Sequence, residues 1–341
     1  MRPTGRFFGI GLAVLIFGWG FLAPEVRGFQ AQPQRSPAYP PPLVSPEQFD
    51  QWMRELSNWG RWGKDDQLGA ANLMTPAKRK QAVALVKEGI SVSLAHRPLL
   101  EKALDNGNPF ERETNLTPNL QGPGFRGSNN RYSVTYHGRA HSHLDGLCHR
   151  FYKEQMYNGF SIQEVTKENG CVKNGIQSFQ NGIITRGVLI DIPRLRGVPY
   201  LEPATPVFPA DIEAWEKETG VKISSGDAIF LYTGRWARRA KVGPFTDFAG
   251  YHALVIPWLK ARDVALIASD GIQDVGDLPN IGSPIHIFGI VALGATLLDN
   301  LDLESLAETA AELKRWEFLL TVAPIPVEAG TGSPVNPIAM F

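Results

Sequence analysis

The stretch YHGRAHSHLDGLCH, residues 136–149, contains four of the chain's seven histidines together with Asp145. His137, His141, His143 and Asp145 occupy alternate positions, and alternate residues of a β-strand project from one face. We therefore predict an extended segment that displays these side chains together. Gly146 then permits a bend that brings His149 back toward them.

A strand face crowded with imidazoles and a carboxylate makes a poor hydrophobic core. Each buried ring needs a hydrogen-bond partner, and neighbouring imidazoles lower one another's pKa. A divalent cation removes both difficulties, because neutral imidazole and carboxylate are among its preferred ligands. We predict a metal site that includes His143 and Asp145. The structural alternative is a histidine-rich loop in solvent.

A second group of candidate ligands lies far along the chain, at His286 and Asp299. An apolar run at 287–293 follows His286 and ends at Gly294, a pattern typical of a short helix with a glycine stop. Along a continuous helix the two side chains would be about 20 Å apart, whereas a break at Gly294 and a returning strand at 295–298 bring them together. We predict both as metal ligands. The alternatives are a helix-start residue for His286 and a turn cap for Asp299.

Helical and extended signals alternate through the rest of the chain. Ser45 and Thr75 each stand before a proline, which is typical of a capped helix start. The predicted helices are 46–59, 76–88, 209–219 and 251–262. Short apolar or β-branched runs predict strands, several of them covered on both faces, at 132–136, 188–192, 228–232, 265–268 and 318–322. The sequence therefore predicts an α/β domain with a mixed sheet and helices.

The residues before position 46 precede this domain. Arg2 and Arg6 stand before an apolar run at 7–23, and a secretory signal has this arrangement. Because about 17–25 apolar residues can also span a bilayer, an uncleaved membrane anchor is the alternative. Residues 32–45 are rich in proline and predict an extended linker. We expect residues 1–31 to direct export to the periplasm or outside the cell. The protein would contact a membrane only if these residues stay uncleaved. We expect residues 46–341 to form one domain.

The overall charge argues against one broad class of partner. Lysine plus arginine number 34, as do aspartate plus glutamate. A chain with no net charge and no basic run has no general attraction for nucleic acid, so we expect a small-molecule substrate. Cys148 and Cys171 could pair in an oxidising compartment. Nothing in the sequence indicates that they meet, and we interpret Cys148 as a small buried residue.

The histidine stretch resembles the motif His-x-Gly-Thr-His-x-Asp-x-Pro-x-His of the cyclase-like family of metal-dependent hydrolases, which includes bacterial kynurenine formamidase, isatin hydrolase and a trans-dienelactone hydrolase. His143, Asp145 and His149 match its second histidine, its aspartate and its last histidine. Other similar stretches are WGKDDQLGAANL at 62–73, Gly-Asp at 226–227, Thr-Gly at 233–234 and Gly-Ser-Pro at 332–334. The resemblance covers residues 46–341 and implies a swivelling β/β/α domain, often assembled as a dimer or tetramer.

The chain departs from this motif at the first histidine, which falls on Arg139. A permanently charged guanidinium is a poor metal ligand. We expect the other same-face histidine nearer to Asp145 in sequence, His141, to take its place, with His137 as the alternative. Family members with two metals complete the second site with a histidine, a role that suits His286, and a glutamate, which Asp299 would replace. The resemblance thus implies one or two divalent ions, zinc or manganese.

The resemblance also implies hydrolysis of an amide, formamide or lactone bond. A divalent ion with an open position lowers the pKa of bound water toward about 7 and polarises a carbonyl oxygen. By resemblance we expect His149 to act as the general base, with plain metal ligation as its alternative. Trp59, Trp62 and Tyr157 are candidate walls of an aromatic substrate pocket, although such side chains more often belong to the core.

No dinucleotide-binding, phosphate-loop or nucleophile-elbow signature competes with this interpretation. We predict an arylformamidase-like enzyme acting on N-formylkynurenine or another aryl amide, as in tryptophan catabolism. A lactone hydrolase of the same family is the close alternative. A non-catalytic exported protein that binds metal or solute is the alternative of a different class, and the loss of the first histidine to Arg139 favours it.

Overall fold

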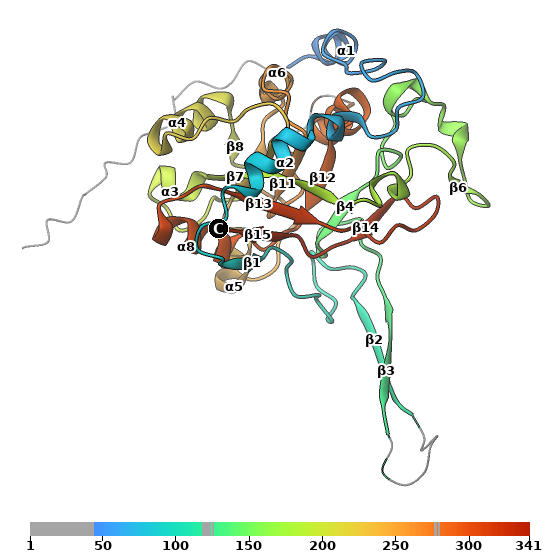
Figure 1. Ribbon diagram of the computed structural model, residues 1–341, viewed down its shortest axis with the longest axis vertical. Coiled ribbons are helices and arrows are strands. Elements are labelled where there is room, and N and C mark those ends of the chain that lie inside the picture. The colour runs from blue at the N-terminus through green and yellow to red at the C-terminus, as the bar shows by residue number, and fades with distance from the viewer. Residues whose placement is uncertain (1–43, 118–123, 125, 276–277, 279) are drawn as a thin grey trace, which may run out of the picture. The chain divides into compact units, whose positions relative to one another are not determined.

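Nine strands form one mixed sheet in the computed structural model, which describes residues 44–117, 124, 126–275, 278 and 280–341 (Figure 1). Their order across the sheet is β1–β15–β13–β7–β9–β11–β12–β4–β14. Their bounds are β1 Ser91–Ser93, β4 His143–Asp145, β7 Ile183–Asp191, β9 Ala228–Tyr232, β11 Leu266–Ser269, β12 Thr296–Asp299, β13 Glu317–Val322, β14 Gly332–Pro334 and β15 Ile338–Met340. Strands β7, β9, β11 and β12 run parallel, and the flanking strands pair antiparallel.

The central strands are apolar along their whole length because both faces of the sheet are covered. Every residue of β9 and of β11 is buried, and parallel strands with covered faces are expected to be continuously apolar. Four predicted strands coincide with β7, β9, β11 and β13 to within a few residues. The fifth, at 132–136, is misplaced, because the strand there ends at Ser133. The predicted α/β class with a mixed sheet is confirmed.

The helices of the described residues lie around the sheet, and most of them have proline as their first or second residue. Their bounds are α1 Pro46–Glu55, α2 Pro76–Val83, α3 Ile192–Arg196, α4 Pro209–Thr219, α5 Arg235–Val242, α6 Ile256–Ala261, α7 Pro284–Ile287 and α8 Glu304–Leu313. The hydroxyls of Ser45 and Thr75 accept hydrogen bonds from Gln48 and Lys78 backbone N–H groups, each at 3.2 Å, so both predicted caps are confirmed.

The four predicted helices differ in how well their ends were placed. The helix predicted at 209–219 coincides with α4, whereas α1 and α2 end before the predicted residues 59 and 88. The helix predicted at 251–262 is three elements, β10 Gly250–Tyr251, the 3-10 turn η5 Ala253–Val255 and α6. Pro257 explains this division, because a proline ring suits the first turn of a helix but not its interior.

Three two-stranded sheets accompany the large one. The longest is the hairpin of β2 Glu111–Leu116 and β3 Ser128–Ser133, which projects from the body of the domain (Figure 1). All twelve residues of its two strands are exposed. The others pair β5 Val165–Thr166 with β6 Gly170–Cys171, and β8 Pro206–Val207 with β10.

The two edges of the nine-stranded sheet come close together because the sheet curls. Residues 335–337 connect β14, at one edge, directly to β15, which pairs with β1 at the other. The Oγ of Ser93 donates to Oδ1 of Asn336 at 2.7 Å, and the N–H of Leu94 donates to the carbonyl of Pro337 at 2.9 Å. We call this junction of the two edges the seam.

A helix with a glycine stop places one half of the candidate site. Helix α7 continues into the π-helical turn η6 Phe288–Leu293, which ends at Gly294 with φ +64°, and β12 then runs back. A Cβ atom at Gly69 would lie 2.2 Å from the carbonyl oxygen of Gly294, so this contact requires glycine. The predicted helix stop and returning strand are confirmed, and the stretch 62–73 packs against the stop.

The N-terminal predictions, for residues 1–31 and nearly all of 32–45, lie outside the described residues. Within the described part of the chain, no helix is both long enough and apolar enough to cross a bilayer.

Candidate metal centre

The histidine stretch is a short strand preceded by an irregular loop. Only residues 143–145 form β4, and residues 137–141 follow a series of bends. Contacts to backbone carbonyls fix this path: Nδ2 of Asn300 donates to Gly138 at 2.8 Å, and the Arg235 guanidinium donates to Arg139. The prediction that residues 137–145 share one strand face is therefore wrong. Arg139 itself is exposed.

Four imidazoles surround the carboxylate of Asp145. Three ring nitrogens approach its Oδ1: His137 Nδ1 at 3.0 Å, His143 Nε2 at 3.4 Å and His149 Nε2 at 3.9 Å. His286 Nε2 lies 3.8 Å from Oδ2. Asp145 is 1 % exposed, and neither carboxylate oxygen receives a hydrogen bond of acceptable geometry.

The far nitrogen of three of these rings is held in place by another group. His143 Nδ1 lies 2.8 Å from the carbonyl of His141, and His137 Nε2 lies 2.9 Å from Oγ1 of Thr331. His286 Nδ1 lies 2.5 Å from Oδ2 of Asp274. When the far nitrogen donates its hydrogen in this way, the near nitrogen of a neutral ring presents its lone pair to the cluster.

His141 lies outside the cluster, contrary to the prediction that it replaces the motif's first histidine. Its Nε2 lies 3.1 Å from the carbonyl oxygen of Asn108, and its ring meets that of Phe110 edge to face. The bends at 137–141 turn the His141 ring away from Asp145 and bring His137 in. The histidine beside Asp145 is therefore His137, the alternative that sequence distance disfavoured.

His286 and Asp299 meet as the predicted path requires, with His286 Nε2 2.9 Å from Asp299 Oδ2. Asp274 also accepts the backbone N–H of Ile285 at 2.6 Å, which fixes the carboxylate beside the ring. The amide of Gln273 donates to Asp299 Oδ1 at 2.9 Å. Asp299 thus keeps one oxygen toward His286 while the other is held by an uncharged donor.

The electrostatics of the rings differ according to the charges around them. Burial lowers the pKa of His149 to about 3, with further lowering by His137 and Arg150 despite Asp145. Burial would also lower the pKa of His286, but Asp299 and Asp274 outweigh it and raise this pKa to about 10. For His143, burial is similarly outweighed by Asp145, and the pKa is raised.

The pKa of Asp145 is shifted in the opposite direction. Burial alone would raise it, but the neighbouring imidazoles of His149, His137 and His143 hold it well below its usual range. The carboxylate at the centre of the cluster is therefore charged across the whole neutral range.

The donor atoms fit a divalent metal in two overlapping groups. Each group holds three residues whose ligand atoms lie within 4.8 Å of one another. We call His137, Asp145 and His149 the outer triad, and His143, Asp145 and Asp299 the inner triad. Imidazole and carboxylate are the ligands of zinc-type sites, and the two unpartnered oxygens of a buried aspartate are left unsatisfied without a cation. Asp145 belongs to both triads.

A disulfide joins Cys148 to Cys171, which corrects the interpretation of Cys148 as merely a small buried residue. The bond holds the residue before His149 against the β5–β6 hairpin. The N–H of Cys148 also donates to the carbonyl of Asn174 at 3.1 Å. Sequence separation alone gave no sign of this pairing, because the approach depends on the tertiary path of residues 165–174.

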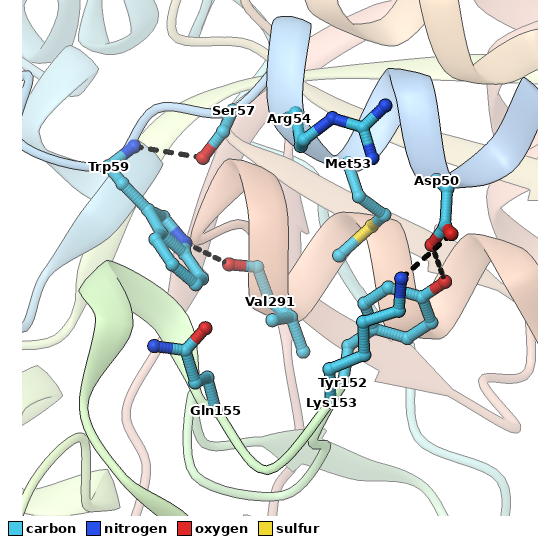
Figure 2. Close-up of a pocket in the computed structure, with 9 residues that line it drawn as sticks. All are labelled: Asp50, Met53, Arg54, Ser57, Trp59, Tyr152, Lys153, Gln155 and Val291. Atoms are coloured by element: carbon cyan, nitrogen blue, oxygen red, sulfur yellow. Dashed lines mark hydrogen bonds and ion pairs between the residues drawn. The ribbon is translucent and has the colours of Figure 1, made fainter.

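The three predicted pocket aromatics lie in different surroundings. Trp59 is on the wall of a cavity of about 410 Å³ between α1 and the loop that contains Tyr152, where its indole N–H donates to the Val291 carbonyl at 2.5 Å (Figure 2). Neither Trp62 nor Tyr157 lines this cavity. Trp62 lies under the Arg61 guanidinium, and Tyr157 is fully buried with its hydroxyl on Asp66. Tyr157 is a core residue.

Sequence reasoning missed three residues that orient the cluster: Asp274, Gln273 and Thr331. Gln273 and Asp274 belong to the mixed stretch SDGIQDV at 269–275, and no spacing connects them to a histidine. Thr331 directly precedes the Gly-Ser-Pro stretch at 332–334, and that resemblance was the one signal available for it. Its position on His137 depends on β14 pairing with β4.

Comparison with known proteins identifies the class. The Cyclase family model matches residues 62–273, which is more than half of the chain. The chain therefore belongs to the Cyclase family, the cyclase-like family of metal-dependent hydrolases that its histidine motif resembles.

Solved structures agree with this assignment. A crystal structure described as a novel cyclase is similar over 84% of this chain and 100% of its own, with 28% identity and a TM-score of 0.76. An isatin hydrolase bound to the product analogue thioisatinate is similar over 77% of this chain and 95% of its own, with 19% identity and a TM-score of 0.51. The second likeness shows the fold alone. A search of curated proteins found no match.

Proposed function

We propose that this chain is a hydrolase that cleaves an amide or formamide bond at the Asp145 cluster with a divalent metal, zinc or manganese. The observation that carries the proposal is the buried carboxylate of Asp145, whose two oxygens accept no hydrogen bond of acceptable geometry although four imidazoles surround them. When bound, the metal supplies Lewis-acid chemistry and an activated water. Membership of the Cyclase family supports the same reaction class.

The outer triad is the side that a substrate can reach. The side chains of His137 and His149 are 25 % and 16 % exposed, whereas those of His143 and Asp299 are 2 % and 4 % exposed. A substrate carbonyl would therefore approach past His137 and His149. The inner triad, with His286 behind it, would support the metal from the buried side.

His149 has two candidate roles, and its surroundings favour metal ligation. Its ring stacks on that of His137 with centroids 3.8 Å apart and planes 3° from parallel. A pKa lowered to about 3 keeps the ring neutral near pH 7, which suits a ligand, but it makes the ring a weak general base. The general-base role remains the alternative, and the two roles predict different losses in a variant.

An aryl formamide such as N-formylkynurenine is the proposed substrate, and an aryl lactone is the alternative. Both bonds have a carbonyl that a metal can polarise, so the cluster by itself favours neither. The cavity in Figure 2 has Trp59 on its wall, but no residue of either triad lines it, so it does not decide between the two substrates. The bond class is therefore a question for direct assay.

The test is to measure metal per chain by elemental analysis and to assay N-formylkynurenine and an aryl lactone on the same full-length sample. We expect hydrolysis of the formamide that a chelator abolishes and that added zinc or manganese restores. Hydrolysis of the lactone alone would reassign the bond. A chain that takes up neither zinc nor manganese from solution would overturn the proposal.

A non-catalytic metal-binding protein is the competing proposal, and His149→Ala separates the two. For an enzyme in which His149 is a ligand, the variant loses both metal affinity and turnover. For an enzyme in which His149 is the base, it retains metal and loses turnover. A binding protein has no turnover in either form, so only its metal affinity could change.

We also propose that the protein is exported and that it assembles as a homo-oligomer. The Cys148–Cys171 disulfide supports export, because structural disulfides persist mainly in oxidising compartments. The β2–β3 hairpin supports assembly, because an isolated two-stranded hairpin is only marginally stable in water and all its strand residues are exposed. Sedimentation velocity of the full chain would measure the oligomeric state, and a monomer would contradict the second proposal.

A further inference from the structure

A buried arginine at the start of helix α5 contacts the loop that precedes β4. Arg235 is 2 % exposed, and its guanidinium carbon lies 4.2 Å from the ring centroid of Trp236 and 4.1 Å from that of Phe248. Two aromatic rings at these distances favour a guanidinium and restrict its orientation. Burial lowers the pKa of Arg235 to about 10, against the effect of Asp105 and Asp270, so the group stays charged at neutral pH.

The guanidinium of Arg235 holds the loop at residues 137–141 in two ways. Directly, its Nη2 donates to the carbonyl oxygen of Arg139. Indirectly, its Nη1 donates to Oδ1 of Asn300 at 2.5 Å, and Nδ2 of Asn300 donates to the carbonyl oxygen of Gly138 at 2.8 Å. Two successive backbone carbonyls are therefore held by a residue of α5 and by the residue that follows β12. We call Arg235 and Asn300 the carbonyl clamp.

The two held carbonyls lie where the chain turns His137 toward the metal centre and Arg139 away from it. His137 Nδ1 is 3.0 Å from Asp145 Oδ1, whereas the side chain of Arg139 is exposed. Between them Gly138 has φ +154°, a backbone conformation that residues with a side chain rarely adopt. The bond to Thr331 holds the His137 ring, whereas the carbonyl clamp holds the backbone that carries this ring.

The alternative is that Arg235 only neutralises buried charge. Its Nη2 lies 3.6 Å from Oδ2 of Asp105, and its Nη1 donates to the carbonyl oxygen of Asp270 at 3.3 Å. However, Arg239, one turn further along α5, already pairs with Asp105 through hydrogen bonds of 2.7 and 3.0 Å. Asp105 thus has a closer partner than Arg235. The contacts that distinguish Arg235 from Arg239 are those to Asn300 and to the loop before β4.

We propose that Arg235 is a positioning residue of the metal centre. Through the carbonyl clamp it turns His137, rather than the side chain of residue 139, toward Asp145, so that His137 completes the outer triad. This explains how the chain keeps a histidine beside Asp145 although Arg139 stands where the family motif has one. The inference rests on the proposed function, because it assumes that the outer triad binds the metal.

The experiment titrates the full-length chain and its variants calorimetrically with zinc. Arg235→Lys keeps a positive charge near Asp105 but loses the planar fork that reaches both Arg139 and Asn300. Asn300→Gly removes the link to Gly138 and tolerates the φ of +56° at this position. Each variant should weaken zinc binding by about 10–100-fold, the range for groups that orient metal ligands.

Arg239→Lys is the matched control. Arg239 lies on the same helix and pairs with the same Asp105, so this variant disturbs the ion pair but leaves the carbonyl clamp in place. Its zinc affinity should equal that of the unaltered chain.

A double variant separates positioning from a general loss of structure. If the carbonyl clamp acts through His137, then adding Arg235→Lys to His137→Ala should weaken zinc binding little more than His137→Ala alone. If the two residues acted independently, their fold-changes would multiply, because the effects of uncoupled substitutions add in free energy.

Either of two titration results would overturn the proposal. One is an unchanged zinc affinity in folded Arg235→Lys or in folded Asn300→Gly. The other is a set of fold-changes that multiply in the double variant with His137→Ala.

A crystal structure of metal-free Arg235→Lys tests the same inference without zinc. The ring of His137 should move away from Asp145, and an unchanged distance between His137 Nδ1 and Asp145 Oδ1 would overturn the proposal. An unaltered chain that binds no zinc would contradict the proposed function instead, and the crystal structure would still decide the role of Arg235.

Discussion

The outer and inner triads share Asp145 but differ in charge and in exposure. The outer triad has two imidazoles and one carboxylate, and its rings are partly exposed. The inner triad has one imidazole and two carboxylates, is buried, and has His286 in contact with Asp299. The pKa of His149 is lowered to about 3, whereas that of His286 is raised to about 10.

This difference indicates how each triad behaves before metal binds. In the inner region, a protonated His286 already neutralises part of the charge of Asp299 and Asp274, so a metal there competes with a proton. In the outer region, the lone pair of His149 is free at neutral pH. The outer triad is therefore ready to accept a cation, and the inner triad must first rearrange its charge.

The largest effect is expected from Asp145→Asn, because Asp145 is the one residue common to both triads. Removing its charge should weaken metal binding at both, by more than the roughly 10–100-fold that changes in outer-shell partners cause. Metal per chain after dialysis measures this. Asp299→Asn is the matched variant and should affect the inner triad alone. Equal metal content in both variants would show that the triads do not share a ligand.

The next effect distinguishes the two histidines that precede β4. His137→Ala should weaken metal binding, because its Nδ1 lies 3.0 Å from Asp145 Oδ1. His141→Ala should leave metal affinity unchanged, because its ring is bonded to Asn108. Calorimetric titration of each variant with zinc measures the difference. The reverse ranking would mean that the bent path of residues 137–141 is wrong.

His137 and His141 also show what could and could not be predicted from the sequence. Local spacing was sufficient for His143, Asp145 and His149, because β4 and the turn after it fix them within a few residues. The sequence also predicts the helix that ends at a glycine and the returning strand, which bring His286 to Asp299. The choice between His137 and His141 could not be predicted from the sequence, because the loop path is set by Asn300, Arg235 and Thr331 from distant parts of the chain.

The same reason explains the other misses. The Cys148–Cys171 bond and the contact of Asp274 with His286 join segments whose separation follows no local period. The predicted strand at 132–136 was misplaced because the β2–β3 hairpin is exposed and polar, so an apolar run did not mark it. Buried strands such as β9 were placed well, because burial on both faces leaves a continuous apolar signal.

The disulfide should support the outer triad more than the inner one. Replacing both Cys148 and Cys171 by alanine should lower the free energy of unfolding by about 3 kcal/mol, given the loop that the bond closes. Because His149 directly follows Cys148, metal affinity of the outer triad should fall as well. Thermal unfolding with and without zinc measures both effects. Unchanged zinc stabilisation in the variant would show that the bond does not position His149.

Raising the pH should strengthen metal binding at the inner triad more than at the outer one. In the metal-free chain the pKa of His286 is raised to about 10, so its ring is protonated at pH 6 and loses the proton as the pH approaches 10. His149, with its pKa lowered to about 3, is neutral throughout that range. Metal per chain at pH 6 and pH 9 should therefore rise, and the rise should disappear in Asp299→Asn. A content independent of pH would contradict the assignment.

The smallest effect is expected from Asp274→Asn. An asparagine has one acceptor oxygen where Asp274 has two, so with that oxygen toward His286 Nδ1 the ring keeps its orientation while the hydrogen bond from the N–H of Ile285 is lost. One of the two carboxylate charges that raise the pKa of His286 is lost as well. Metal affinity at the inner triad should change by about tenfold or less. The pH dependence should shift to lower pH, because His286 then releases its proton more easily.

Asp263→Asn is the control, since Asp263 pairs with Arg61 at 2.6 Å in a partly exposed ion pair apart from the cluster, where such pairs contribute about 0–1 kcal/mol. It should leave both the metal affinity and its pH dependence unchanged. A shift of the pH profile in Asp274→Asn without loss of fold is the result that a merely structural role for Asp274 would not produce. The competition between the proton on His286 and a metal at the inner triad would then depend in part on the charge of Asp274. The inner and outer triads would therefore differ in charge as well as in burial.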